Sequence, residues 1–105
     1  MTKRFLIKYT RDPATGSVED WHRAVEAFIA GIDADPVLGG RIAYRCMKAR
    51  DGEAYYHLAE PADDEAAKVL NEQAWFKRYT EETRRVGGGR VEVVPLETIA
   101  ETRKR

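Results

Sequence analysis

RIAYRCMKARDGEAYYHLAE, residues Arg41–Glu60, consists of two strand-like runs joined by Asp51-Gly52. Asp-Gly between two such runs is the strongest short signal for a β-hairpin, and it predicts a loop of two residues. Such a loop sets the register, and the pairs on one face of the hairpin are Tyr44–Ala59, Cys46–His57 and Lys48–Tyr55. The other face carries the alternate residues, Ala43, Arg45, Met47, Ala49, Ala54, Tyr56 and Leu58.

Before the hairpin, the sequence predicts a strand and then a helix. The strand-forming run RFLIKYT, Arg4–Thr10, is followed by a dense turn signal, RDPATGS. Ser17 has the side chain of a helix N-cap, and apolar residues follow it at spacings of three and four. They form one helical stripe, which ends before Pro36 and consists of Val18, Trp21, Val25, Phe28, Ile29 and Ile32.

After the hairpin, the sequence predicts a second helix and a last strand. The helix has Asp63 or Asp64 as its N-cap and extends to Val86, where three glycines stop it. The strand RVEVVPLETI contains Pro95, which lacks a backbone N–H and therefore belongs at a sheet edge. The order βαββαβ predicts an α+β, ferredoxin-like fold, with both helices on one side of an antiparallel sheet.

Along the second helix, the apolar residues change face. One set falls within about a quarter turn and consists of Ala66, Ala67, Leu70 and Ala74. The next set lies roughly half a turn away and consists of Phe76, Tyr79, Thr83 and Val86. Because a straight helix cannot bury both sets on one surface, we predict a kink or short break around Glu72–Ala74.

Composition limits the class of protein. The 105 residues suit one domain, and 18 basic residues balance 18 acidic ones, which argues against a dedicated nucleic-acid or anionic-membrane surface. The single cysteine, Cys46, excludes an internal disulfide, and no apolar run has the length of a signal-peptide core or a membrane span. We therefore expect one cytoplasmic domain over residues 1–105, with 99–105 as a flexible tail.

Both faces of the predicted hairpin carry apolar and aromatic side chains. Two helices cover only one face of a sheet, and a stable monomer rarely exposes a large apolar patch. We therefore expect a homodimer in which two sheets meet face to face. The sequence leaves open which hairpin face meets the partner and which faces the helices.

This pattern resembles the dimeric α+β barrel superfamily, and within it the antibiotic-biosynthesis-monooxygenase-like proteins. The resemblance covers Arg4 to Thr98 and rests on the βαββαβ order, on Gly39-Gly40 before the second strand, and on the broken second helix with its WFKRY motif. Members share a fold and differ in function: they include cofactor-independent oxygenases of polycyclic phenols, haem-degrading enzymes, and isomerases and dehydratases of small cyclic substrates.

The resemblance implies a site on the second helix. Asn71 and Trp75 match an Asn–Trp pair, four residues apart, of the quinone-forming monooxygenases and are candidate catalytic residues. Their N–H groups would hydrogen-bond substrate oxygen and dioxygen, while a deprotonated phenol reduces dioxygen directly without flavin or metal. Haem-degrading relatives carry a histidine ten residues after the tryptophan, where this chain has Arg85. The resemblance thus implies an aromatic or polycyclic substrate and no cofactor.

Among the titratable residues, His57 is the candidate catalytic base, because an imidazole in mid-strand can accept the proton of a phenol. Four residues are candidates to contact substrate: Tyr44 and Tyr55 share its face, Tyr79 lies one turn after Trp75, and His22 borders the first helical stripe.

Each candidate also has a purely structural interpretation. Trp75 and Tyr79 suit a core, Asn71 suits a cap for backbone groups freed at the break, and His57 suits a buried histidine satisfied by a tyrosine hydroxyl. Two functional alternatives follow. One is a dimeric small-molecule-binding protein without known activity; the other is an isomerase or dehydratase of a small cyclic substrate, with His57 as its base.

Overall fold

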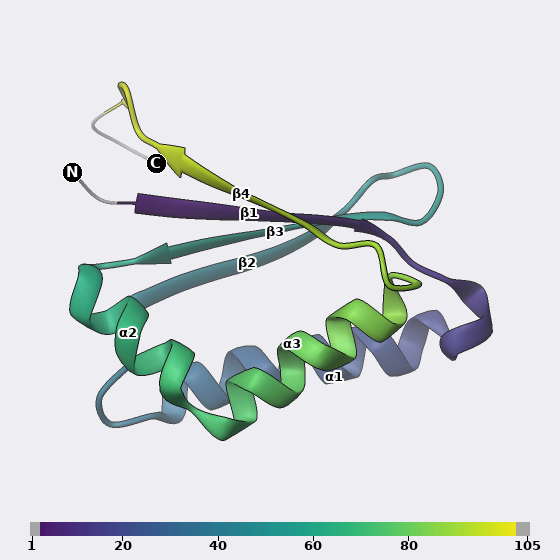
Figure 1. Cartoon of the computed structure of the whole chain (residues 1–105), viewed down its shortest axis with the longest axis horizontal. Coiled ribbons are helices and arrows are strands. Elements are labelled where there is room, and N and C mark those ends of the chain that lie inside the picture. The colour runs from purple at the N-terminus through teal and green to yellow at the C-terminus, as the bar shows by residue number, and fades with distance from the viewer. Residues whose placement is uncertain (1–2, 103–105) are drawn as a thin grey trace.

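A computed structural model describes residues 3–102. In chain order its elements are β1 (Lys3–Thr10), the 3-10 helix η1 (Pro13–Thr15), α1 (Val18–Ala34), β2 (Ile42–Lys48), β3 (Ala54–Pro61), α2 (Asp64–Glu72), α3 (Ala74–Val86) and β4 (Glu92–Glu97). The antiparallel sheet has the order β2-β3-β1-β4. The α-helices lie on one side of it, and no helix of the described chain covers the other side (Figure 1). The α+β ferredoxin-like prediction is confirmed.

The hairpin has the predicted register and a longer loop. Cys46 pairs with His57 and Lys48 with Tyr55, as the sequence predicts. The ladder ends earlier, however, at the bond from Ala49 N–H to the Ala54 carbonyl oxygen, so residues 50–53 form the loop. A two-residue loop would also place Arg50 opposite Glu53. Instead, the Glu53 carbonyl accepts from the N–H of Arg11, which follows β1, at 2.8 Å.

The structure also answers which hairpin face meets the helices. Tyr55 and His57 are 1% and 0% exposed, respectively, because their face lies beneath the helical layer. On the other face, Met47 is 40% and Tyr56 37% exposed. The face with the histidine therefore bounds the interior, and the alternate residues form the outer face of the sheet.

Both long helical segments begin at the predicted caps. The Ser17 hydroxyl accepts from the Asp20 N–H at 3.0 Å, and the Asp63 carboxylate accepts from the Ala66 N–H at 2.8 Å. Each cap satisfies a donor that the first turn of a helix leaves free. The predicted stripe of α1 is largely buried, at Trp21, Val25, Phe28 and Ile32.

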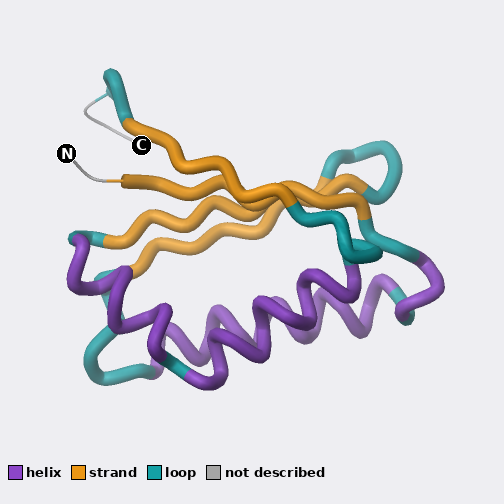
Figure 2. Tube along the Cα trace, in the orientation of Figure 1, coloured by secondary structure: helices purple, strands orange, loops and turns teal. Residues whose placement is uncertain are grey.

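The predicted break in the second helix is present. Gln73 is extended (φ −75°, ψ 131°) and separates α2 from α3, which Figure 2 shows as a loop segment between two helical ones. Before the break, Leu70 is buried, and after it Val86 is buried. The turn of the backbone at Gln73 therefore lets both apolar sets face the sheet.

The chain ends along an edge of the sheet. Gly88 and Gly89 have φ of +65° and +83°, values that favour glycine, and they end the helical segment as predicted. β4 pairs only with β1, so Pro95 lies on an edge strand, although β4 is shorter than the predicted RVEVVPLETI. Residues 98–102 have no regular secondary structure, and residues 103–105 of the predicted tail lie outside the described chain.

The interior contains two adjoining apolar clusters. One gathers Phe28, Ile32, Leu38, Ile42, Ala66 and Leu70 beneath α2, and the other gathers Tyr9, Trp21, Val25, Tyr55 and Val86 toward the far end of α3. Partly buried Ile29 and Tyr79 pack against both clusters, which makes the interior continuous. None of the helices within residues 3–102 has the length and apolarity of a membrane span.

Candidate functional site

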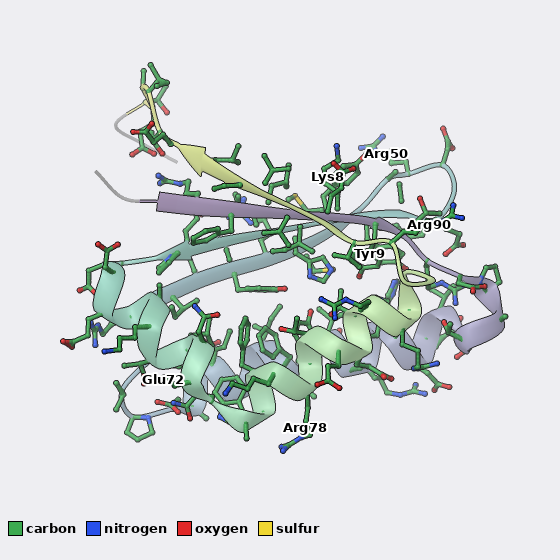
Figure 3. All side chains as sticks on the ribbon, viewed as in Figure 1. Lys8, Tyr9, Arg50, Glu72, Arg78 and Arg90 are labelled. Carbon is green, nitrogen blue, oxygen red and sulfur yellow. The ribbon has the colours of Figure 1, made fainter. Side chains whose placement is uncertain are left out.

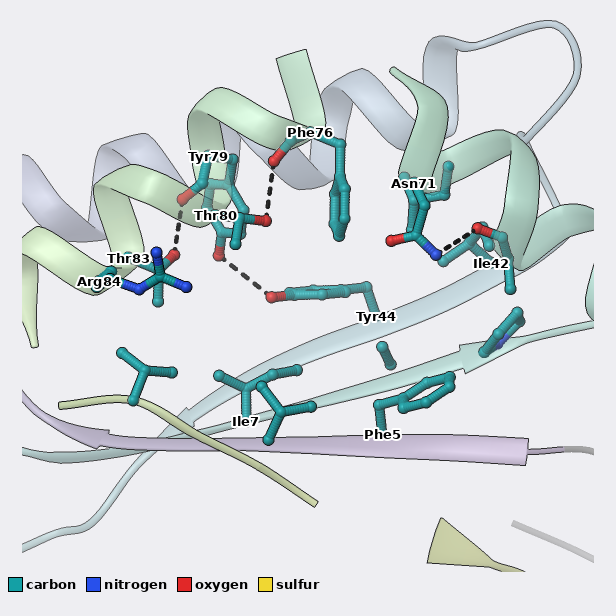
Figure 4. A pocket seen from close by; sticks show the side chains of 16 residues that line it. Phe5, Ile7, Ile42, Tyr44, Asn71, Phe76, Tyr79, Thr80, Thr83 and Arg84 are labelled. Atoms are coloured by element: carbon teal, nitrogen blue, oxygen red, sulfur yellow. Dashed lines mark hydrogen bonds between the residues drawn. The ribbon is translucent and has the colours of Figure 1, made fainter. Parts of the chain in front are cut away.

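A cavity of about 330 Å³ lies between the sheet and the helices α2 and α3 (Figure 4). Its apolar walls come from β1, β2 and β4 on one side and from α2 and α3 on the other, and they include Phe5, Ile7, Ile42, Leu70, Phe76 and Val93. Its polar lining comprises Tyr44, Asn71, Tyr79, Thr80, Thr83 and Arg84. An apolar cavity with a few polar groups is typical of a site for a small organic molecule.

Two tyrosine hydroxyls form the polar centre of this cavity. Tyr44 Oη, from β2, lies 3.3 Å from Tyr79 Oη, from α3 (Figure 4). Burial raises the pKa of both phenols, so both keep their protons at neutral pH. Phe28 holds the Tyr79 ring in place by parallel stacking, with ring centroids 3.6 Å apart. The pair is therefore suited to donate hydrogen bonds and unsuited to act as a base.

His57 lies directly behind the two tyrosines. Its Nδ1 is 2.6 Å from Tyr44 Oη and 3.3 Å from Tyr79 Oη, and its Nε2 is 2.7 Å from Tyr9 Oη. Burial lowers the pKa of the imidazole to about 4, so it is neutral at pH 7. The histidine is absent from the cavity lining. A ligand meets this candidate base only through the tyrosine hydroxyls, and the structural interpretation of His57 as hydroxyl-bonded agrees with these contacts.

The hydrogen bonds continue past His57 into the core. Trp21 Nε1–H donates to Tyr9 Oη at 2.8 Å, and both side chains are about 95% buried. Figure 3 shows Tyr9 on the helix side of the sheet. Sequence reasoning passed over Tyr9, although its spacing from Phe5 and Ile7 would place all three on the same face of a strand.

The structure separates the candidate catalytic pair. Asn71 lines the cavity, and its Nδ2 donates back to the Ala67 carbonyl, four residues earlier within α2, at 2.9 Å (Figure 4). Trp75 follows the break, is absent from the lining, and packs against Phe28 with ring centroids 5.8 Å apart. Only the asparagine is thus in position to contact a molecule in the cavity.

Of the four candidate substrate contacts, the cavity brings two together, Tyr44 and Tyr79. Tyr55 is buried elsewhere in the core, stacked on Tyr9 with centroids 5.3 Å apart. Its hydroxyl lies 2.8 Å from Nε2 of the exposed His22. Neither Tyr55 nor His22 lines the cavity. They form a separate contact at the end of the sheet.

The charge at the cavity comes from Arg84 of α3. Arg84 is exposed, lines the cavity, and has no ion-pair partner within residues 3–102. The lining contains no carboxylate. By contrast, Arg78 on the same helix points away from the sheet (Figure 3). The cavity thus offers a cation and several neutral donors. No three His, Cys, Asp or Glu side chains of the described chain form a potential metal site.

Comparisons with known proteins give matches by structure. No protein-family model and no curated protein sequence matches the chain. SnoaB, a cofactor-independent oxygenase from Streptomyces nogalater, matches as a mutant structure with a TM-score of 0.77 and 14% identity over 98% of each chain. A candidate antibiotic biosynthesis monooxygenase from Caulobacter crescentus matches with a TM-score of 0.74 and 16% identity, over 94% of this chain and 91% of the other.

A dimeric ferredoxin-like protein of unknown function from Jannaschia sp. also matches. Its TM-score is 0.70 at 19% identity, and the match covers 93% of this chain and 100% of the other. Near-complete coverage at such low identity establishes a common fold. This chain therefore shares its ferredoxin-like fold with these three proteins.

Proposed function

We propose that this protein is a cofactor-independent monooxygenase-like enzyme that oxidises an aromatic or polycyclic small molecule in the cavity between the helices and the sheet. The observation that carries the proposal is the cavity itself, whose apolar walls surround the Tyr44 and Tyr79 hydroxyls and the Asn71 amide. The fold shared with SnoaB, a cofactor-independent oxygenase, adds support.

The reaction balances without an added cofactor. A phenol or an activated CH₂ group of the substrate loses a proton to water in the open cavity. The resulting anion forms a carbon–oxygen bond to dioxygen, and the peroxide takes a proton back from water to give a hydroperoxide. Loss of water then leaves a carbonyl: the CH₂ group gives up two hydrogens and gains one oxygen atom, and the second oxygen atom leaves in that water. The protein contributes position and stabilisation of the substrate oxyanion.

Three polar groups are proposed to hold that oxyanion. Tyr44 and Tyr79 keep their protons because burial raises their pKa values, and when one hydroxyl bonds the other, the pair still has one O–H to donate to an oxyanion. The Asn71 Nδ2 group has two hydrogens, and its bond to the Ala67 carbonyl uses only one of them. Trp75, through its contact with Phe28, supports the packing around Tyr79 and does not touch the substrate.

Oxygen consumption with anthrones, hydroquinones and flavonols tests this proposal, without added flavin or metal. Wild type is expected to consume oxygen with at least one class. Replacing Asn71 by alanine should lower kcat/KM roughly tenfold, because one hydrogen bond to a charged oxygen is lost. Gln73→Ala is the matched control: the Gln73 amide also donates to a carbonyl four residues earlier, that of Val69, but Gln73 lies outside the cavity lining, so the kcat/KM of this variant should stay near wild type.

The outcome also separates the alternatives. Saturable binding of these compounds with no oxygen consumption would contradict the enzyme proposal and identify a small-molecule-binding protein. Equal losses in Asn71→Ala and Gln73→Ala would show that the helix break, and not the cavity contact, matters for activity.

We also propose that the outer face of the sheet forms a homodimer. Leu58 lies opposite Leu6, and Leu6 lies opposite Val94, so an apolar row crosses three adjacent strands on the face without helices. Met47, Tyr56 and Leu96 are exposed on the same face. Burial of these side chains against a second copy would remove them from water.

Replacing Leu6 by glutamate is expected to convert the dimer to a monomer, because the carboxylate would be buried between Leu58 and Val94, at the centre of the apolar row. Light scattering after size exclusion gives the mass of each species. Arg78→Glu is the control on the solvent side of α3 and should leave the dimer intact. A wild-type protein that is monomeric at all concentrations tested would overturn the dimer proposal.

A further inference from the structure

A buried chain of hydrogen bonds leads from the core to the cavity. It begins at Trp21 Nε1–H, passes through Tyr9 Oη and both ring nitrogens of His57, and ends at the hydroxyls of Tyr44 and Tyr79. His57 is 0% exposed, and Trp21 and Tyr9 are 4% and 5% exposed. A buried polar group needs a hydrogen-bond partner if its burial is not to be costly. The proposed reaction does not by itself explain why so many polar groups lie behind the cavity wall.

The core end of the chain fixes the direction of its hydrogen bonds. An indole N–H only donates, so Tyr9 Oη accepts from Trp21. A phenolic O–H prefers one of two positions in the plane of its ring, and the Trp21 N–H obstructs the position on its own side. The Tyr9 hydrogen therefore points to His57 Nε2, which must be unprotonated to accept it. With Nε2 protonated, the hydrogen-bond partners of Tyr9 within residues 3–102 would include no acceptor for its hydrogen.

This direction determines what the cavity end can do. A neutral imidazole with a free Nε2 carries its proton on Nδ1, so Nδ1–H donates to the Tyr44 oxygen at 2.6 Å. The two tyrosine hydroxyls, 3.3 Å apart, can form one bond with each other. The second hydroxyl hydrogen then needs another acceptor, and the Thr83 side chain, which also lines the cavity, is a described partner beside the Tyr79 hydroxyl. Both tyrosines line the cavity, so water or a ligand can supply that acceptor.

We propose that Tyr9 and His57 are positioning residues: Tyr9 holds His57 as its Nδ1–H tautomer, and His57 in turn orients Tyr44. The Tyr44–Tyr79 pair then presents an O–H donor that selects the phenolate or enolate form of a ligand. Arg84 at the cavity adds a positive charge that favours the same anionic form. The proposal rests on the proposed function insofar as the cavity binds the ligand. The direction of the hydrogen bonds from Trp21 to Tyr44, however, is a property of the protein without ligand.

The tautomer of His57 is measured first, by two-bond nitrogen–proton correlation spectroscopy of the ¹⁵N-labelled protein. Wild type is expected to show a protonated Nδ1 and an unprotonated Nε2. Tyr9→Phe should increase the population protonated at Nε2, the form that free imidazole side chains prefer. Tyr55→Phe is the matched control, because it also removes a buried hydroxyl but one that contacts His22, and it should retain the Nδ1–H form.

Either of two results overturns the proposal. One is an Nε2–H tautomer in wild type, which is decisive even if Tyr9→Phe does not fold. The other is an unchanged tautomer in folded Tyr9→Phe, which would show that Tyr9 does not position the imidazole.

Binding of 4-nitro-1-naphthol tests the ligand preference, because its naphtholate absorbs visible light and can be counted directly at a fixed pH. Wild type should bind the naphtholate more tightly than the neutral naphthol. Tyr44→Phe should weaken naphtholate binding roughly tenfold or more, and Tyr9→Phe should weaken it in the same direction. An unchanged preference in Tyr44→Phe would overturn the donor role. Failure of wild type to bind the probe would instead count against the cavity as the ligand-binding site. The measured tautomer of His57 would still test the direction of the hydrogen-bond chain.

Discussion

Phe28→Ala is expected to lower the free energy of unfolding by about 3–5 kcal/mol, the cost of truncating a buried aromatic residue where the neighbours relax only partly. Phe28 is 7% exposed and lies at the centre of the aromatic cluster. Its ring stacks on Tyr79 and also contacts Tyr44, Trp75 and Phe76, with centroid distances between 5.0 and 5.9 Å. These ring contacts join α1 to both α3 and β2.

Urea denaturation monitored by circular dichroism gives the free energy for wild type, Phe28→Ala and Phe28→Leu. The leucine variant keeps most of the volume and should lose clearly less stability than the alanine variant. If alanine costs no more than leucine, the cluster closes around the gap and Phe28 is not its centre. Because Tyr79 would also lose its stacking partner, the alanine variant should bind cavity ligands more weakly even at temperatures where it is fully folded.

The sequence predicted the elements that depend on local pattern. Asp51-Gly52 between two strand-like runs was sufficient to pair Cys46 with His57, and the change of apolar face was sufficient to place the break at Gln73. In each case the relevant information lies within a few residues along the chain. The four-residue hairpin loop was not predictable in this way, since it depends on the contact of Glu53 with Arg11, 42 positions earlier.

The cavity was predictable only in part, for a related reason. Tyr44, Tyr79 and Asn71 were candidates from the sequence and do line it. Trp75 follows the break, and the change in backbone direction turns it onto Phe28, so four-residue spacing no longer implies a shared face. In the sequence, Arg84 is one of several charged residues near the end of the second predicted helix. Its position beside the cavity follows only from how α3 crosses the sheet.

The role of His57 shows what burial adds to a sequence pattern. A histidine in mid-strand beside tyrosines suits a catalytic base, and the same residues also suit a satisfied core histidine. The two differ in the environment of the ring, which the sequence does not encode locally. With 0% exposure and tyrosine hydroxyls on both nitrogens, the ring is neutral and fixed in orientation. It can influence a ligand through Tyr44 without ever exchanging a proton with it.

That burial also predicts acid sensitivity. The pKa of His57 is about 4 in the folded protein and 6.5 for an unburied histidine, because burial disfavours the charged ring. Between these values the unfolded chain binds a proton that the folded chain does not. The free energy of unfolding must therefore fall as the pH falls from 6.5 toward about 4, and this contribution to stability is fully present well above pH 6.5. The expected loss is about 2 kcal/mol between pH 6.5 and about pH 5.

Denaturation in urea at several pH values measures this slope. Carboxylates contribute little above about pH 5, since three of them, Glu53, Asp63 and Glu82, have pKa values lowered by hydrogen bonds from ordinary values of 4.5, 3.8 and 4.5. His57→Gln should be less stable at neutral pH and should lose the slope, because a neutral amide cannot take up a proton. His22→Gln removes the other histidine and leaves His57 in place, so the slope should persist. If the free energy of unfolding of wild type does not change across this pH window, the imidazole is protonated equally in the folded and unfolded states. That result would contradict a neutral His57 ring and, with it, the proposed direction of the hydrogen-bond chain.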